Sequence, residues 1–376
     1  MEIYAPESAF LPLFNKLERL ISDGEGDISI LHIGGSHVQG GFLTDRLRAN
    51  FQSFIPGLTS ERGFVFPYKM AGTNSPSSIK ATWTGKWTGC RNSVSTHACN
   101  WGMSGISALC SDTLAEFSIE ALRTDSSFYR SNMVRVYYES IGEYSIEADS
   151  ALSVKEILNF EEEGYIEFHF NTSYESFKFK IRQEDQRYAG TFYLQGFYFG
   201  NDSPGIVYNA IGVNGAGTYS YLKCGLFGPQ IKTIAPDLVF FGIGVNDANV
   251  PESDFNPSLY EARYDSLVSL IKASNPNAAL VFITNNDTYY QRRFPNPNAL
   301  KVQETMQRLA EKHSAAVYDL FAIMGGLGSI DDWRDASLAA KDRIHLSRNG
   351  YELQADLMFE AFRNAFGDYL SSKHSP

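Results

Sequence analysis

The sequence lacks the motifs that mark several large classes of metalloprotein and nucleotide-binding protein. It contains no Cys-x-x-Cys and no His-Glu-x-x-His, and its seven histidines are scattered, so nothing supports a metal site. No Gly-x-x-x-x-Gly-Lys-Ser/Thr occurs, and the glycines at 212, 215 and 217 stand in the wrong order for a dinucleotide-binding fingerprint. We therefore expect no metal and no cofactor.

Positive charge and long apolar runs are also scarce. The 376 residues include 32 Lys and Arg against 43 Asp and Glu, and the net charge of -11 repels polyanions, so we expect no nucleic-acid partner. No stretch approaches the length of a transmembrane span, so we expect no membrane insertion. The first residues lack a basic-then-apolar leader. We expect a periplasmic or extracellular protein whose leader is absent from this numbering, with a cytoplasmic protein as the alternative.

Cysteines are few. The four are Cys90, Cys99, Cys110 and Cys224, of which Cys90 and Cys99 are the nearest in sequence. They could form disulfides, but the pattern does not decide the pairing. In a chain this long, an even number of cysteines says little about the compartment.

Apolar residues make up 43% of the sequence, enough for a large core, and they are arranged differently at the ends and in the middle. Near both ends, apolar strands alternate with amphipathic helices, which is typical of a parallel sheet covered by helices. The expected strands are 28–33, 237–244, 279–284 and 315–320, and the expected helices include 42–54, 258–274, 298–313 and 349–366. Between them, alternating runs at 133–138, 165–170, 176–181 and 191–199 are typical of an antiparallel sandwich.

Three segments carry residues suited to chemistry. Ser36 follows the strand 28–33 in a Gly-Gly-Ser-His segment, where its hydroxyl is exposed and helix-start amides face it. Asp342 and His345, three residues apart, could supply the carboxylate and imidazole that activate a serine hydroxyl. Asn246 follows the strand 237–244, at the sheet edge where open α/β folds build their sites.

Each segment alone also has a simpler interpretation. A serine in a Gly-rich segment commonly serves the turn, and Asn-Asp after a strand commonly caps a helix. His37 is a weaker candidate base than His345 because adjacent side chains point apart, and His32 alternates with apolar neighbours as a core histidine does. The second glycine of a Gly-x-Ser-x-Gly elbow is missing, which disfavours the α/β-hydrolase family. The order and context of the segments together favour catalysis.

Along the chain, the segments at Ser36, 209–217, Asn246 and 342–345 resemble, in this order, the serine, glycine, asparagine and Asp-x-x-His blocks of the SGNH (GDSL-type) hydrolase superfamily, with Gly35 where that family commonly has Asp. The resemblance spans about residues 28–55 and 205–366. It implies a three-layer α/β/α flavodoxin-like fold with a parallel sheet.

The same resemblance implies roles for individual residues. Ser36 would be the nucleophile, His345 the base, and Asp342 the residue that orients the base. The oxyanion hole would combine the Ser36 amide, the Asn246 side chain and the Gly215 amide, with Gly212 as the fallback for Gly215.

The spacing of the blocks predicts an insertion. Ser36 and Gly215 should line one site although 179 positions separate them, far more than one helix and one strand require. We expect an SGNH domain at 1–59 and 205–376, interrupted at 60–204 by an antiparallel β-sandwich that overhangs the site. This layout resembles the peptidoglycan O-acetylesterases and related carbohydrate esterases, in which the insert is carbohydrate-binding-module-like.

The expected function is that of a serine esterase that removes short acyl groups, above all acetyl, from an acylated carbohydrate, with cell-wall glycan as one candidate. Trp83, Trp87 and Trp101 of the insert are candidate sugar-stacking residues, although most aromatic residues in a sandwich belong to its core. The alternatives are a lipase or thioesterase, a sugar O-acetyltransferase, or a non-catalytic glycan-binding protein. The sequence does not decide the oligomeric state.

Overall fold

The computed structural model describes residues 2–3, 9–58, 60–201 and 203–373. A six-stranded sheet has the order β1-β19-β16-β15-β2-β14, in which β1 is antiparallel and the other strands are parallel. Its strands are β1 (Glu2–Ile3), β2 (Asp27–Gly34), β14 (Gly205–Gly212), β15 (Leu238–Gly242), β16 (Ala279–Ile283) and β19 (Ala316–Tyr318). The predicted parallel sheet is present, and its last strand is shorter than the expected 315–320 because Asp319 caps the next helix, accepting from the Ala322 amide.

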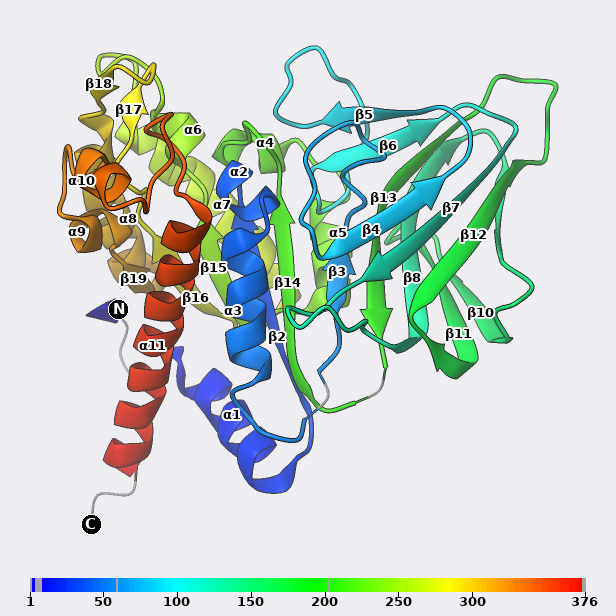
Figure 1. The fold of residues 1–376 in the computed structure, drawn as a ribbon, viewed down its shortest axis with the longest axis horizontal. Coiled ribbons are helices and arrows are strands. Elements are labelled where there is room, and N and C mark those ends of the chain that lie inside the picture. Colours follow the sequence, from blue (N-terminus) through cyan, green and yellow to red (C-terminus); the bar gives the residue numbers. More distant parts are fainter. Residues whose placement is uncertain (1, 4–8, 59, 202, 374–376) are drawn as a thin grey trace.

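Helices cover both faces of this sheet (Figure 1). One face packs against α1 (Leu11–Asp23), α3 (Phe42–Gln52) and α11 (Arg348–Lys373), and the other against α5 (Phe227–Ile234), α7 (Pro257–Ser274) and α8 (Asn298–His313). The shorter helices are α2 (Ser36–Gln39), α4 (Thr218–Leu222), α6 (Val245–Ala248), α9 (Leu320–Met324) and α10 (Ile330–Asp335). The chain passes from β2 to β14 on one side and later to β15 on the other, so the strand order reverses at β2, where ligands bind in such folds.

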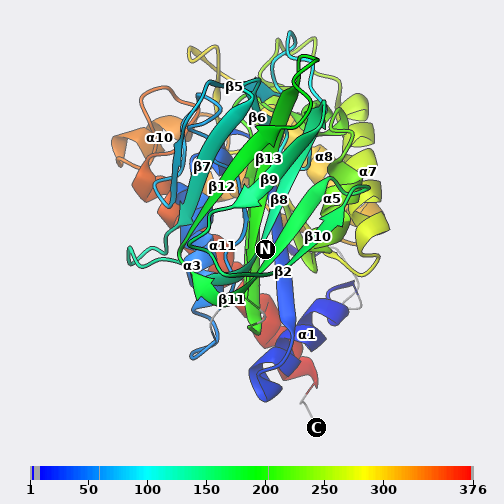
Figure 2. The same cartoon turned by 90° about the vertical axis from the view of Figure 1, so that its right-hand side faces the viewer.

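The segment between β2 and β14 forms two antiparallel sheets, which lie beside the β14 edge of the parallel sheet (Figures 1 and 2). The first has the order β10-β11-β8-β13-β6-β5, with β3 also paired to β13, and the second the order β4-β7-β12-β9. The strands are β3 (Gly63–Val65), β4 (Ile79–Trp83), β5 (Trp87–Arg91), β6 (Ile106–Cys110), β7 (Leu114–Ala121), β8 (Ser131–Ile141), β9 (Tyr144–Ala148), β10 (Val154–Phe160), β11 (Tyr165–Tyr174), β12 (Ser176–Gln183) and β13 (Thr191–Gly200). A small hairpin, β17 (Tyr289–Tyr290) and β18 (Phe294–Pro295), follows β16.

Aromatic side chains fill the space between the two antiparallel sheets. Phe117 of β7 lies 5.8 Å from Phe197 of β13, and Phe177 of β12 lies 5.3 Å from Phe199 of β13, measured between ring centroids. The buried residues of β7 and β12 alternate with partly or fully exposed ones, so the period-two pattern predicted the sandwich correctly. Its core continues into the residues that face α5 and α7, so the sandwich is packed onto the α/β layers. The exact division at 60 and 204 and the likeness to a carbohydrate-binding module remain predictions.

Candidate active site

Three strands of the parallel sheet end at the same level. Gly34 at the end of β2 pairs in register with Gly212 of β14 on one side and with Gly242 of β15 on the other. The segments that follow carry Ser36, Gly215 and Asn246, so the register of the sheet brings these three residues to one edge. The strand ends are also tightly packed, since a Cβ on Gly34 would lie 2.3 Å from the Val38 side chain.

Ser36 is the first residue of the short helix α2, and its hydroxyl meets a histidine from the far end of the chain. The Ser36 Oγ lies 2.8 Å from Nε2 of His345, and Nδ1 of His345 lies 2.7 Å from Oδ2 of Asp342. The Asp342 carboxylate can only accept a hydrogen bond, so Nδ1 of His345 carries the ring proton, and Nε2 is free to accept a hydrogen bond from the Ser36 hydroxyl. The structure thus brings the three predicted residues together in one hydrogen-bonded chain.

The loop before α11 holds Asp342 in place. Its Oδ1 accepts from the backbone amides of Ile344 and His345, each at 3.0 Å. Burial acts to raise the pKa of the Asp342 carboxyl, but the hydrogen bonds from the His345 ring and from these two amides outweigh it and hold the pKa well below its usual range. The carboxylate therefore stays charged opposite the imidazole.

Gly215 and Asn246 lie with Ser36 and His345 around one cavity of about 490 Å³. Gly215 has a φ of 80°, a conformation that favours glycine, in the loop that follows β14. One N–H of the Asn246 amide donates to the carbonyl of Ala216 at 2.9 Å, which fixes the side chain and leaves its second N–H for another acceptor. The Asn246 side chain can therefore donate to a group bound in the cavity.

The fallback Gly212 has a different position. It belongs to β14, does not line the cavity, and leaves no room for a side chain, because a Cβ would lie 2.5 Å from the Gln39 amide nitrogen. Its carbonyl accepts from the Tyr68 hydroxyl. Gly212 is thus a packing glycine, and the structure favours Gly215.

Of the two other histidines near β2, His32 is fully buried and His37 is partly buried. Nδ1 of His37 lies 2.7 Å from the Tyr351 hydroxyl, and its ring centroid lies 5.0 Å from that of His345. Nδ1 of His32 lies 2.7 Å from the Tyr208 hydroxyl. Burial lowers the pKa of each to about 3, with a further lowering of the His37 pKa by His345, so both rings stay neutral. The position of His345 beside Ser36 makes it the better candidate base.

A network around Gln39 escaped the sequence analysis. The Gln39 side chain is 1% exposed, accepts from the Asn214 amide at 2.7 Å and donates to the Asn74 carbonyl at 2.8 Å. The Asn214 side chain also donates to the side chains of Thr73 and Asn74. The network joins the end of α2 and the segment before β4 to the residue that precedes Gly215, so we regard Gln39 as a positioning residue.

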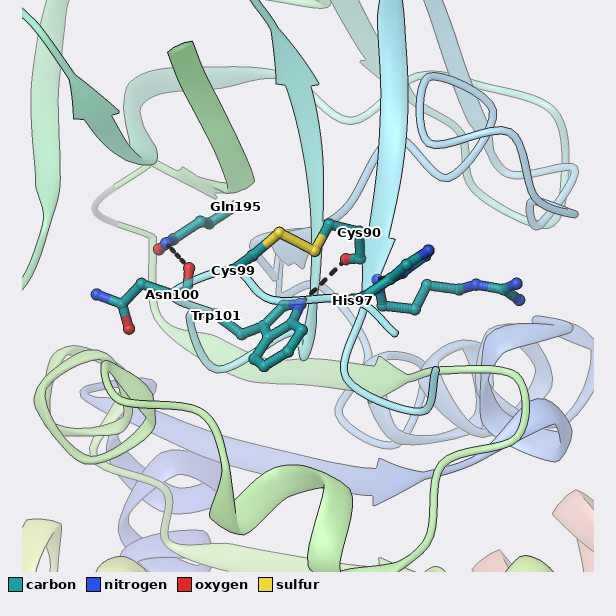
Figure 3. Close-up of a disulfide and its surroundings, with 7 residues drawn as sticks. Cys90, His97, Cys99, Asn100, Trp101 and Gln195 are labelled. Carbon is teal, nitrogen blue, oxygen red and sulfur yellow. Dashed lines mark hydrogen bonds between the residues drawn. A yellow bond between two sulfur atoms is a disulfide. The ribbon is translucent and has the colours of Figure 1, made fainter. Parts of the chain in front are cut away.

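The three candidate tryptophans do not line the cavity. Trp101 is only 5% exposed, and its indole N–H donates to the Cys90 carbonyl beside the Cys90–Cys99 disulfide (Figure 3), so it is a core residue and a poor candidate for sugar stacking. Trp87 packs its ring edge-on to Phe117, whereas Trp83 is 39% exposed at the end of β4. Sugar contact by Trp83 or Trp87 remains a prediction.

The part of the chain that the structure describes contains no cluster of three or more His, Cys, Asp or Glu arranged to hold a metal ion. Within the same ranges, no helix is both long enough and apolar enough to cross a membrane.

Comparison with known proteins agrees with this architecture. Residues 191–353 match the model of the GDSL-like Lipase/Acylhydrolase family, a range that includes Gly215, Asn246, Asp342 and His345. A solved structure described as a peptidoglycan O-acetylesterase in action is similar over 97% of this chain and 99% of its own, with a TM-score of 0.75 and 19% identity. This chain has the fold of the SGNH hydrolases. The resemblance is confirmed for the sequence blocks within residues 191–353 and for the fold, including the inserted β-rich segment, whereas the block around Ser36 lies outside the matched range.

Other solved structures match part of the chain. A lipase/acylhydrolase from Enterococcus faecalis is 22% identical, with 44% of this chain and 77% of its own covered and a TM-score of 0.34. The acetylxylan esterase Axe2 from Geobacillus stearothermophilus is 23% identical, with 43% and 73% covered and a TM-score of 0.33. No curated protein matches the sequence.

Proposed function

We propose that this protein is a serine esterase that removes short acyl groups, with acetyl the expected one, from a carbohydrate. The observation that carries the proposal is the hydrogen-bonded chain from Ser36 through His345 to Asp342 at the wall of a cavity that Gly215 and Asn246 also line. A structure described as a peptidoglycan O-acetylesterase shares the fold over nearly the whole chain, which supports cell-wall glycan as a candidate substrate.

The mechanism follows from this geometry. Nε2 of His345 takes the proton of the Ser36 hydroxyl as Oγ attacks the ester carbonyl, and the amides of Ser36 and Gly215 with the Asn246 side chain stabilise the oxyanion. The ester C–O bond breaks, and the sugar oxygen leaves with the proton held by His345. A water molecule, deprotonated by His345, then attacks the acyl group on Ser36, and the carboxylic acid departs as Oγ regains a proton.

The wall of the cavity combines polar and apolar groups. Asn74, Asn214 and Asn249 carry amide groups that can bind sugar hydroxyls. Apolar side chains such as Leu346 and Val245 supply surface that suits an acyl group. The lining therefore fits an acylated carbohydrate, and the length of the acyl group is tested with the ester series below.

The Cys90–Cys99 disulfide supports a location outside the reducing cytoplasm. Together with a candidate cell-wall substrate, it leads us to propose a periplasmic or extracellular protein.

Hydrolysis of p-nitrophenyl esters tests the proposal. Rates with acetate, butyrate and octanoate should fall with chain length, and acetylated polysaccharides should release acetate. A preference for octanoate would favour a lipase, and acetyl transfer to an added sugar in place of hydrolysis would favour a transferase. If the wild type binds glycan but hydrolyses every ester no faster than the Ser36→Ala variant does, the protein is a non-catalytic binding protein and the proposal is overturned.

A further inference from the structure

A second cavity, larger than the first, lies between the hydrolase helices and the sandwich. Its volume is about 710 Å³, within the range of about 300 to 1,000 Å³ typical of ligand pockets. The hydrolase side is formed by α3 and the start of α11, and the sandwich side by Ser77, Ser78 and the turn 122–126. Gly40 and Phe42 line both this cavity and the candidate active site, so the two meet at the start of α3.

The walls of this cleft are held in place from both sides. The Tyr129 hydroxyl of the sandwich donates to the Gln52 side chain of α3 at 2.6 Å. The Arg123 guanidinium lies 4.1 Å from the centre of the Tyr129 ring and donates to the Ser60 carbonyl. Near the junction, Gly41 has a φ of 85° and a Cβ there would lie 2.6 Å from Pro76, so the segment before β4 packs directly on the turn into α3. The cleft is therefore a preformed feature of the fold.

The lining suits a polyhydroxylated ligand. Most of its side chains end in hydroxyl, amide or guanidinium groups, among them Asn50, Ser53, Ser77, Thr124, Arg123 and Arg348. Such groups hydrogen-bond sugar hydroxyls, and arginine also pairs with carboxylates. Arg348 stands over the Phe42 ring at 5.3 Å, beside the passage to the active site. The cleft also contains Asp45, Asp125 and Glu352, and three of its four arginines already pair with carboxylates, Arg46 with Asp356, Arg48 with Asp45 and Arg348 with Glu352. Its charge is therefore nearly balanced, which suits a neutral, hydroxyl-rich chain.

We propose that this cleft is a second subsite that binds the glycan chain beyond the acylated sugar, so that the enzyme acts on polymers in preference to small esters. The inference rests on the proposed function. A polymer that is bound in the cleft gains contacts away from the reacting ester, and these contacts can lower the activation free energy of the reaction in the neighbouring cavity. A small ester does not reach the cleft and lacks these contacts.

Two substitutions that fill the cleft from opposite sides test the inference. Ala49→Tyr acts from α3 and Thr124→Tyr from the turn of the sandwich. The matched controls are Ala262→Tyr on α7 and Thr88→Tyr on β5, both at exposed positions outside the two cavities. The measured quantity is kcat/KM for acetate release from O-acetylated peptidoglycan and from acetylated xylan, divided by kcat/KM for p-nitrophenyl acetate.

For whichever polymer the wild type prefers, both cleft variants should lower this ratio at least tenfold, and both controls should leave it within twofold of wild type. In the Ser36→Ala background, the cleft substitutions should weaken binding of fragments of that polymer by a similar factor. An unchanged ratio in both cleft variants, or a wild type that hydrolyses p-nitrophenyl acetate but neither polymer, would overturn the subsite while leaving esterase activity in place. If the wild type hydrolyses no ester at all, the proposed function itself fails.

Discussion

Asp342→Asn tests whether the Asp342 carboxylate fixes the proton on His345. In the structure, Oδ1 accepts two backbone amides at 3.0 Å and Oδ2 faces Nδ1 of His345 at 2.7 Å. An asparagine can keep an oxygen for the amides, but its NH₂ group then points at Nδ1, which must become an acceptor. The imidazole proton moves to Nε2, 2.8 Å from the Ser36 Oγ, and the ring can no longer take the serine proton.

The expected loss in kcat is about 10⁴-fold, or ~5.4 kcal/mol of activation free energy, because the wrong tautomer disables the base while the geometry is kept. The assay is kcat for p-nitrophenyl acetate, with Asp342→Ala as the comparison. Alanine leaves Nδ1 open to water and both tautomers accessible, so we expect it to lose less activity than asparagine. An Asp342→Asn variant that keeps a tenth or more of the wild-type kcat would refute this reasoning.

A stability measurement on the same variant checks the electrostatic part. Folding lowers the pKa of Asp342, so its carboxylate stabilises the fold at every pH above the pKa of an unfolded Asp, which is about 4. This contribution is lost as the pH falls from there toward the pKa of the folded state. The free energy of unfolding of Asp342→Asn should therefore depend less on pH below about 4 than that of the wild type.

Three further predictions follow from the cavity and its supports. Asn246→Ala removes a donor to the oxyanion, so kcat should fall by about 10²- to 10³-fold with KM little changed, whereas a change in KM alone would make Asn246 a substrate-binding residue. Gln39→Leu leaves the Asn214 amide without its acceptor and should lower both Tm and kcat. Gln39→Glu keeps that acceptor, so relative to Gln39→Leu it should restore kcat more than it restores Tm. Equal restoration of both would indicate a purely structural role. The Cys90→Ser/Cys99→Ser double variant opens a short loop and should lower the free energy of unfolding by about 2 to 3 kcal/mol in denaturant titrations, and no loss would mean that the pair does not form in solution.

The sequence was sufficient to predict the residues that end strands or share a short motif. Ser36 and Asn246 follow strongly apolar strands, so the parallel register alone places them at one edge. Asp342 and His345 lie three residues apart in one loop and meet without help from the rest of the fold. The alternating pattern of β12 likewise predicted a sandwich, because a strand with one buried face alternates buried and exposed side chains, whereas the central strand β13 is buried at most of its positions.

What the sequence did not predict depends on contacts between distant segments. Gln39, Asn74 and Asn214 meet only because the chain folds back on the turn after α2, and nothing in their spacing encodes their hydrogen bonds. The core position of Trp101 depends on packing beside the Cys90–Cys99 disulfide, which a single tryptophan in a sequence does not indicate. The cleft between α3 and the sandwich has the same origin, since its two walls come from segments some 75 residues apart, at Ala49 and Thr124.

The most direct test of the central claim is covalent labelling of the nucleophile. A fluorophosphonate reacts much faster with a serine that a neighbouring base activates than with other side chains. Intact-mass and peptide analysis of the labelled wild type should show one adduct, on the peptide that contains Ser36, in step with the loss of p-nitrophenyl acetate hydrolysis. The Ser36→Ala variant should take up no label and have no activity, with an unchanged Tm. An adduct on another residue, or hydrolysis that survives in Ser36→Ala, would contradict the assignment of Ser36 as the nucleophile.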